Sequence, residues 1–295
     1  MVAGLVACTL LVAHSDADLG REVSAQPTAP ELIYLPPVRF LRAVSLGYEH
    51  ALADVLWFRT INYFGSHLWT DRDYPWLASM CETVTDLDPH AEYVYEFGGV
   101  TLPWMADRAD DGIALLEKGA RNIPQSWRLR YMIGFSYYFF KDDLAAASRA
   151  FESAARMPDT PQFVSGMAAT IFAAQQGTDN AIAFLAELER GNPNEEMRGA
   201  IRERVLELAL TRDIDGLEAA VKSFESRFAR RPADLDELVA VGIVQNIPNE
   251  PFGGRYLLNP DTGNVSSSTG HAPKRLQRSK IHEQFVRGKN AGGQP

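Results

Sequence analysis

Cysteine is scarce in this sequence: among its 295 residues only Cys8 and Cys81 carry thiols. Two thiols cannot supply a disulfide framework, nor a zinc site built from several cysteines. Cys81 stands in the stretch WLASMCETV, where we expect a small buried hydrophobic residue of a helix. The cysteine content therefore predicts neither structural disulfides nor bound zinc.

Residue spacings typical of metal sites are also sparse. His50 and Asp54, like His67 and Asp71, are four residues apart and would share helix faces. No third ligand follows at a suitable spacing, so we expect no metal site.

Motifs that mark common enzymes are missing. The sequence contains no glycine-rich phosphate loop, no serine nucleophile elbow, no HExxH helix and no Cys–His pairing. We therefore expect a protein that is not an enzyme and that uses no cofactor and no small-molecule substrate. An enzyme with an unrecognised site stays an alternative, because paired carboxylates leave little trace in a sequence.

Basic residues are the minority: 29 Lys and Arg stand against 38 Asp and Glu, a formal net charge of −9. This balance argues against nucleic acid as a partner. Residues 271–295 form a basic tail with six Lys or Arg and a single acid, Glu283, which leaves a net charge of −14 on residues 1–270. We expect the tail to be disordered, or to lie on an acidic partner or on the acidic body of its own chain.

The chain opens with an apolar run. Residues 1–13, MVAGLVACTLLVA, are fewer than the about 20 that span a bilayer, but they match the apolar region of a signal sequence or part of a membrane anchor. LVAC resembles the lipobox of bacterial lipoproteins, which would make Cys8 a lipidation site. Residues 14–37 are polar and contain prolines, as in a linker. We expect a location on the periplasmic side of a bacterial inner membrane, with a lipoprotein or a cytoplasmic protein as alternatives.

Four prolines are evenly spaced: Pro89, Pro124, Pro158 and Pro193 are 35, 34 and 35 residues apart. An apolar stretch of helical period precedes each, and no strand pattern is found between Leu46 and about Pro232. A fixed period of this length indicates a helical repeat.

Small and large residues recur in register with these prolines. Gly99 and Gly134 each follow a proline by ten residues, and Leu116 precedes Pro124 by eight. Small residues let two helix axes approach, and a large residue one turn later fills the remaining space. In the third unit the corresponding Phe151 is seven residues from its proline, so we expect the loop between that unit's helices to be one residue longer.

The third unit carries the pattern most completely, with Trp127, Gly134, Tyr137, Ala147, Phe151, Ala154 and Pro158. It resembles the tetratricopeptide repeat, a pair of antiparallel helices in a unit of 34 residues. The resemblance covers about residues 47–232 and implies five helical pairs, the first and fifth degenerate. It implies an all-α fold, a right-handed α-α superhelix, over a domain at residues 38–232.

The resemblance also implies that the first helices of the pairs line a concave groove. The groove-facing candidates are Tyr93, Glu96, Trp104, Arg128, Tyr131, Phe135 and Tyr138. An aromatic groove with one arginine suits an apolar or acidic partner segment. The alternative is that these aromatics are core, which we favour for Phe139 and Phe140 and leave open for Tyr131 and Tyr138.

Ahead of the repeats, residues 41–69 read as one long, unusually apolar helix, interrupted at most by Gly47. Asp54 and Arg59 lie within it. They form either a buried ion pair or a solvent-facing polar stripe, and we favour the stripe.

Residues 233–270 change character. A short helix capped by Asp234 is followed by RYLL and NVSSS on either side of the turn NPDTG, which predicts a small β-hairpin with about four residues per strand. The PFGGRY region resembles the ends of type II secretion pseudopilins and of bacterial envelope repeat proteins. We expect this extension to cap the last helical pair or to offer a sheet edge to a partner strand.

These features together predict a scaffold, a subunit or assembly factor of a bacterial envelope complex. Its partners would be membrane proteins, and the N-terminus would attach it to the membrane. A peptide-binding adaptor that exchanges clients through the aromatic groove is the alternative.

Overall fold

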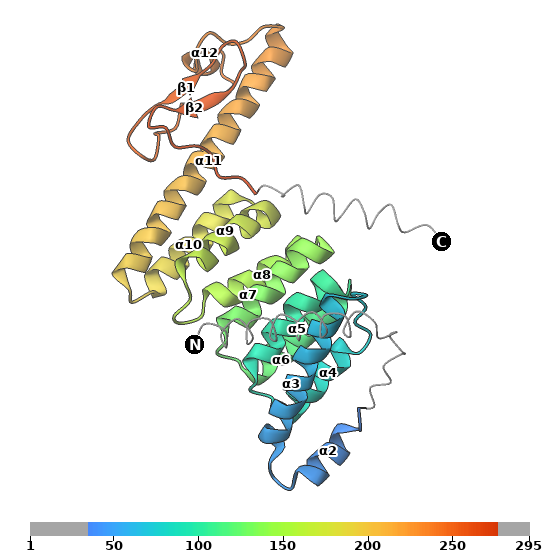
Figure 1. The fold of residues 1–295 in the computed structure, drawn as a ribbon. Helices are drawn as coiled ribbons and strands as arrows, with labels where there is room; N and C mark the ends of the chain where they lie inside the picture. The colour runs from blue at the N-terminus through green and yellow to red at the C-terminus, as the bar shows by residue number, and fades with distance from the viewer. Residues whose placement is uncertain (1–34, 277–295) are drawn as a thin grey trace, which may run out of the picture. The chain divides into compact units, whose positions relative to one another are not determined.

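The computed structural model describes residues 35–276, and this part of the chain is mainly helical (Figure 1). The helices are α2 Val38–Ser45, α3 Glu49–Leu68, α4 Leu77–Leu87, α5 Glu92–Met105, α6 Ala109–Asn122, α7 Trp127–Ser136, α8 Leu144–Ala155, α9 Gln162–Gln176, α10 Thr178–Gly191, α11 Glu195–Phe228 and α12 Asp236–Ala240. A π-helical turn, η1 (Tyr137–Lys141), follows α7, and two antiparallel strands, β1 (Tyr256–Leu258) and β2 (Val265–Ser267), lie near the C-terminal end. The predicted all-α repeat fold with a small hairpin is confirmed.

Four helical hairpins stack through the middle of the chain: α3 with α4, α5 with α6, α7 with α8, and α9 with α10 (Figure 1). Each of the four evenly spaced prolines lies between one hairpin and the next helix, at Pro89, Pro124, Pro158 and Pro193. Proline suits these junctions because it cannot continue a helix. The predicted unit boundaries are therefore correct.

The two register glycines lie where paired helices touch. A Cβ atom on Gly99 would come within 2.5 Å of the Leu116 side chain, and one on Gly134 within 2.9 Å of the Phe151 ring. Both distances are too short for any side chain larger than hydrogen. The glycine and the large residue that recur in the sequence therefore contact each other inside each of these two hairpins.

The extra residue of the third unit has a local cause. At the end of α7 the backbone widens into η1, and a π-turn accommodates one more residue than an α-turn. Asp142 then takes a left-handed conformation, with φ 53°, and the carboxylate of Asp143 accepts the backbone N–H of Ala146 at 2.9 Å to begin α8. The extra residue predicted for the loop between the helices of the third unit is therefore accommodated by the π-turn.

The predicted fifth helical pair is wrong. Residues 195–228 form a single helix, α11, which ends at Ala229 in a left-handed conformation. Its second half packs against the C-terminal residues instead of against a partner helix, and Tyr256 and Val265 join Leu217, Val221 and Phe224 in one apolar core. The extension therefore caps one long helix.

The long apolar helix predicted ahead of the repeats is broken once. Leu46 and Gly47 both have positive φ angles, 51° and 90°, and they separate α2 from α3. Asp54 and Arg59 are both exposed on α3, as expected for a solvent-facing stripe. Among residues 35–276, the structure contains no helix with the length and apolar character that a bilayer crossing requires.

The C-terminal cap, residues 233–270, has polar contacts in addition to the apolar core that it forms with α11. Asp234 accepts the backbone N–H of Glu237 at 2.9 Å at the start of α12, as predicted. The hairpin pairs Tyr256 with Ser267 and Leu258 with Val265, three residues per strand where about four were predicted.

Candidate interaction surfaces

The predicted groove residues lie on two neighbouring helices and the π-turn. Tyr93, Glu96 and Trp104 are on α5; Arg128, Tyr131 and Phe135 are on α7; Tyr138 is in η1. The helices α5 and α7 are in contact, so six of the seven residues belong to one row of first helices. Tyr93, Trp104 and Arg128 are exposed.

Tyr138 requires a correction, because its side chain is only 8% exposed. It belongs to the apolar core of the α8–α11 region together with Phe139 and Phe140, the two rings for which core was favoured. The π-turn places all three side chains inward. Tyr138 is therefore not available to a partner in this structure.

The aromatic rings of the first helices pack on one another. Tyr131 lies edge-on to Phe151 and to Phe163, with 5.4 Å between ring centroids in both pairs, and Phe135 stacks on Phe139 at 5.5 Å. The Tyr131–Phe163 contact joins α7 to α9, and Trp57 of α3 similarly meets α5. Most rings of the predicted groove thus serve the packing between hairpins.

Two charged residues flank this aromatic row. Burial raises the pKa of Glu96, and the nearby Glu92 carboxylate adds to the rise while Arg128 opposes it. The guanidinium of Arg128 lies 5.6 Å from the centre of the Trp127 ring. This part of the row can meet an apolar segment that carries a charge.

A second surface lies on α2, the turn after it, α3 and Trp69, the residue that follows α3. Its members are large apolar side chains with at least half of their area exposed: Phe40, Val44, Leu46, Tyr48, Val55, Phe58 and Trp69, which we call the N-terminal apolar surface. Exposure reaches 84% at Leu46 and 85% at Trp69. Soluble monomers rarely expose large contiguous apolar patches, which commonly mark interaction sites.

The sequence contained a signal for this surface. Apart from polar positions such as Asp54 and Arg59, residues 41–69 carry apolar side chains on more than one side of the helix, and such a helix needs cover on more than one side. In α3 only Ala53, Thr60 and Tyr63 are buried. Many of the apolar side chains of this segment are therefore exposed in the described structure and not buried in its core.

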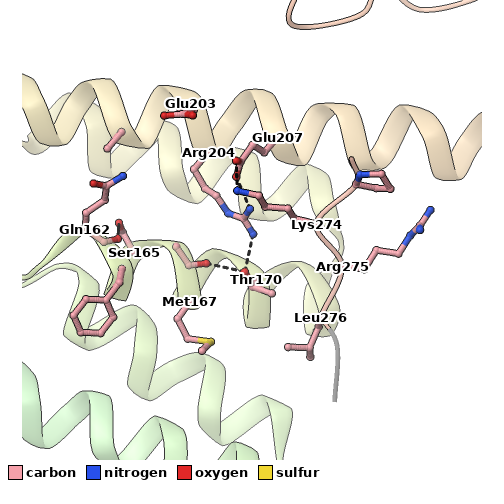
Figure 2. Close-up of a pocket in the computed structure, with 14 residues that line it drawn as sticks. Gln162, Ser165, Met167, Thr170, Glu203, Arg204, Glu207, Lys274, Arg275 and Leu276 are labelled. Carbon is pink, nitrogen blue, oxygen red and sulfur yellow. Dashed lines mark hydrogen bonds and ion pairs between the residues drawn. The ribbon is translucent and has the colours of Figure 1, made fainter. Parts of the chain in front are cut away.

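A third surface is a pocket of about 850 Å³ between α9 and α11, which we call the α9–α11 groove (Figure 2). Residues of α9, residues of α11 and the chain segment from Pro273 to Leu276 line it. Gly166 lies on its α9 side with nothing within 4 Å of the position of a Cβ atom. The backbone of α9 is therefore open to close approach here.

A network of charged groups crosses the α9–α11 groove, as Figure 2 shows. Arg204 donates to Glu207 at 2.7 Å and to the Thr170 hydroxyl at 2.7 Å, and Lys274 donates to the same Glu207 carboxylate. Burial by itself would raise the pKa of Glu207, but the hydrogen bonds from Lys274 and Arg204 outweigh it and hold the pKa below its usual range. Glu207 is one of the groups that bind the start of the basic tail to α11.

The start of the basic tail, residues 271–276, follows α11. The backbone N–H of Lys274 donates to the Thr211 hydroxyl at 3.0 Å, and Arg275 donates to Asp215 at 2.9 Å. Leu276 packs against the core of the α8–α11 region. Of the predicted alternatives, these six residues lie on the acidic body of their own chain.

The remaining predicted sites are quickly placed. Within residues 35–276 no group of three or more His, Cys, Asp or Glu side chains could hold a metal ion, and His67 pairs with Asp71 at 2.6 Å. Cys81 is buried in α4, and burial raises the pKa of its thiol to about 12. Cys8, with the apolar run 1–13, lies outside the described residues.

Comparison with known proteins assigns no relative. No family model matches this chain, and no curated protein matches it.

Proposed function

We propose that this protein is a non-catalytic helical-repeat scaffold, a subunit or assembly factor of a membrane complex of the bacterial cell envelope. The observation that carries the proposal is the N-terminal apolar surface. Full burial of each of its side chains stabilises a complex by roughly 1.5–3 kcal/mol before the costs of association. A partner that covers a few of them gains enough to bind stably.

The position of this surface in the chain favours a membrane protein as the partner. It begins directly after the linker, residues 14–37, which joins it to the apolar run 1–13. A random-coil chain of 24 residues, the length of segment 14–37, has an end-to-end distance of roughly 25–30 Å. If the apolar run is a membrane anchor, the surface is held within reach of the bilayer and of proteins embedded in it.

The experiment uses the full chain extracted from membranes in mild detergent. The double variant Phe58→Ser with Trp69→Ser should lose at least tenfold of the co-purifying membrane proteins, measured by quantitative mass spectrometry. Because both side chains are exposed, the helical circular dichroism should not change.

The matched control is Leu257→Ser, which removes an exposed apolar side chain from the cap hairpin. It should keep the full set of partners. Unchanged partners in the double variant, or a wild-type protein that elutes alone and monodisperse, would contradict the proposal.

A peptide-binding adaptor is the second candidate, supported by the exposure of Tyr93, Trp104 and Arg128 on adjoining helices. The variant Arg128→Ala should then weaken the binding of client peptides and leave the fold intact. Trp104→Ala and Tyr131→Ala are unsuitable for this test, because Trp104 packs on Phe139 and Phe140 and Tyr131 packs on Phe151 and Phe163, so either loss would also destabilise the fold.

A further inference from the structure

The C-terminal part of the chain runs along α11 in the direction opposite to the helix. The backbone N–H of Val265 lies 3.4 Å from Glu218, the side chain of Arg275 reaches Asp215, and Lys274 reaches Thr211 and Glu207. From Val265 to Lys274 the backbone contact on α11 moves from Glu218 to Thr211, while the Arg275 side chain reaches back to Asp215. The chain therefore arrives at the α9–α11 groove heading toward the beginning of α11.

The described chain stops at the groove itself. Leu276 is a lining residue of the groove, and Gln162, Ala200 and Glu203 line the part that lies beyond Lys274 along both helices. Glu203 is one helical turn before Glu207, so it is the next carboxylate in the direction of travel.

We propose that the α9–α11 groove is the docking site of this chain's own C-terminal segment, residues 277–287. The segment is basic, with Arg278, Lys280 and Arg287 against the single acid Glu283, and its counterpart in the groove is Glu203, since Glu207 is already bound by Arg204 and Lys274. The segment also supplies apolar side chains, Ile281 and Phe285, for the apolar edge of the groove.

The C-terminal segment is long enough to follow the groove from Thr170 to Gln162. From Thr170 to Gln162 a helix rises about 12 Å. Four extended residues, 277–280, cover about the same distance. Ile281 then reaches the beginning of α9, where the Phe163 ring is 55% exposed and lines the groove.

Carbodiimide cross-linking of the full chain tests the proposal, because this reagent joins a lysine amine directly to a carboxylate in contact with it. The expected product links Lys280 to Glu203 within one chain, and Lys274 linked to Glu207 serves as the internal positive control. A mixture of ¹⁵N-labelled and unlabelled protein distinguishes links within a chain from links between chains by mass spectrometry.

A pair of glycine variants gives the matched control. Gly166→Met fills the groove from α9 and should lower the Lys280–Glu203 product at least fivefold. Gly216→Met makes the same change on α11 at a position with equally open space that does not line the groove, and it should leave the product unchanged. Both replace a helical glycine with a better helix former, so both should fold.

Three results would overturn the proposal. They are a product of equal yield in Gly166→Met, a product found only between labelled and unlabelled chains, and the absence of any Lys280 product where the Lys274–Glu207 link forms. The proposal does not depend on the scaffold function, and none of these results bears on the N-terminal apolar surface.

Discussion

The hairpins from α3 to α10 and the region from α11 to Leu276 both have apolar cores, but the second region also depends on side-chain hydrogen bonds to irregular chain. In the hairpins, small residues such as Gly99 and Gly134 admit large apolar ones, and fully buried side chains fill the contacts. In the C-terminal region, side chains of α11 hydrogen-bond the cap and the tail, as Asp213 does with Tyr256 and Thr211 with Lys274.

The difference follows from what each region has to bury. A helix satisfies its own backbone groups, so two helices need only matching shapes to pack. The cap is mostly irregular chain, whose backbone N–H and C=O groups need partners from elsewhere. We therefore expect damage to the hairpins to spread through the stack and damage to the cap to stay local.

The largest expected effect is that of Phe151→Ala. Phe151 is fully buried, touches Gly134 inside its hairpin and meets the Tyr131 ring. Loss of a buried phenyl ring costs roughly 3–5 kcal/mol, and urea unfolding of the variant should show it. Phe163→Ala, at an exposed ring of the same type, should cost about 1 kcal/mol or less. Equal costs would show that the hairpin contact is not the source of stability.

The next effect compares two glycines with the same substitution. In Gly99→Ala the new methyl group would lie 2.5–2.8 Å from three carbon atoms of Leu116, and we expect a loss of roughly 2–3 kcal/mol. Gly166→Ala has open space and should gain about 0.5–1 kcal/mol, because alanine favours the helix. Urea unfolding of both variants measures the difference, and the same sign for both would contradict the close-packing explanation.

The success of the repeat prediction has a steric cause. A proline that ends a helix and a glycine that admits a neighbour are both local requirements, so they are visible in one sequence at a fixed period. The failure at α11 is instructive, because Asp213, Asp215 and Gly216 look like the residues of a turn. In the fold the two aspartates bind Tyr256 and Arg275, which lie far away in the sequence.

The interaction surfaces were only partly predictable for a related reason. Helical period shows that residues 131–140 and 41–69 are apolar, but it does not show which apolar side is covered. Coverage depends on neighbours in space: the π-turn buries Tyr138, while Phe58 and Trp69 stay exposed. The α9–α11 groove is formed by three separate parts of the chain and had no signal in the sequence beyond the uneven charge.

The third effect concerns Glu250, which holds the cap from inside. Its carboxylate is 6% exposed and accepts hydrogen bonds from the backbone of Phe252 and Gly254 and from the hydroxyls of Ser267 and Thr269. Glu250→Ala leaves these donors unpaired and should cost roughly 2 kcal/mol. Hydrogen exchange should accelerate in α12, β1 and β2 and stay unchanged in α5 to α8. Glu250→Gln keeps one oxygen for the two backbone donors and should cost less than half as much.

The lowered pKa of Glu250 also indicates how the stability of the cap depends on pH. Burial by itself would raise the pKa of Glu250, but its four hydrogen bonds outweigh this and lower the pKa below the usual value. A carboxyl group whose pKa is lower in the folded state stabilises the fold fully above its unfolded pKa of about 4.3, and the contribution is lost as the pH falls through the folded pKa. The protection of the hairpin amides against hydrogen exchange, taken relative to the intrinsic exchange rate at each pH, should therefore fall below about pH 4 in the wild type. Glu250→Gln should remove this dependence, and a dependence that persists in it would assign the effect to other groups.

The smallest expected effect is that of a Tyr→Phe substitution, made once in the hairpins and once in the cap. Tyr95→Phe removes a hydroxyl that donates to the Pro89 carbonyl at 3.2 Å and accepts from Asn122 at 2.8 Å, and Tyr256→Phe removes one that donates to Asp213 at 3.0 Å. Each loss should cost about 1 kcal/mol, since both rings stay in place. Tyr95→Phe should accelerate hydrogen exchange across the neighbouring hairpins, whereas Tyr256→Phe should do so in the cap alone. Because the energies are matched, the extent of the spread measures how each region is held together. An equally wide spread in both variants would mean that the cap and the hairpins unfold as one unit.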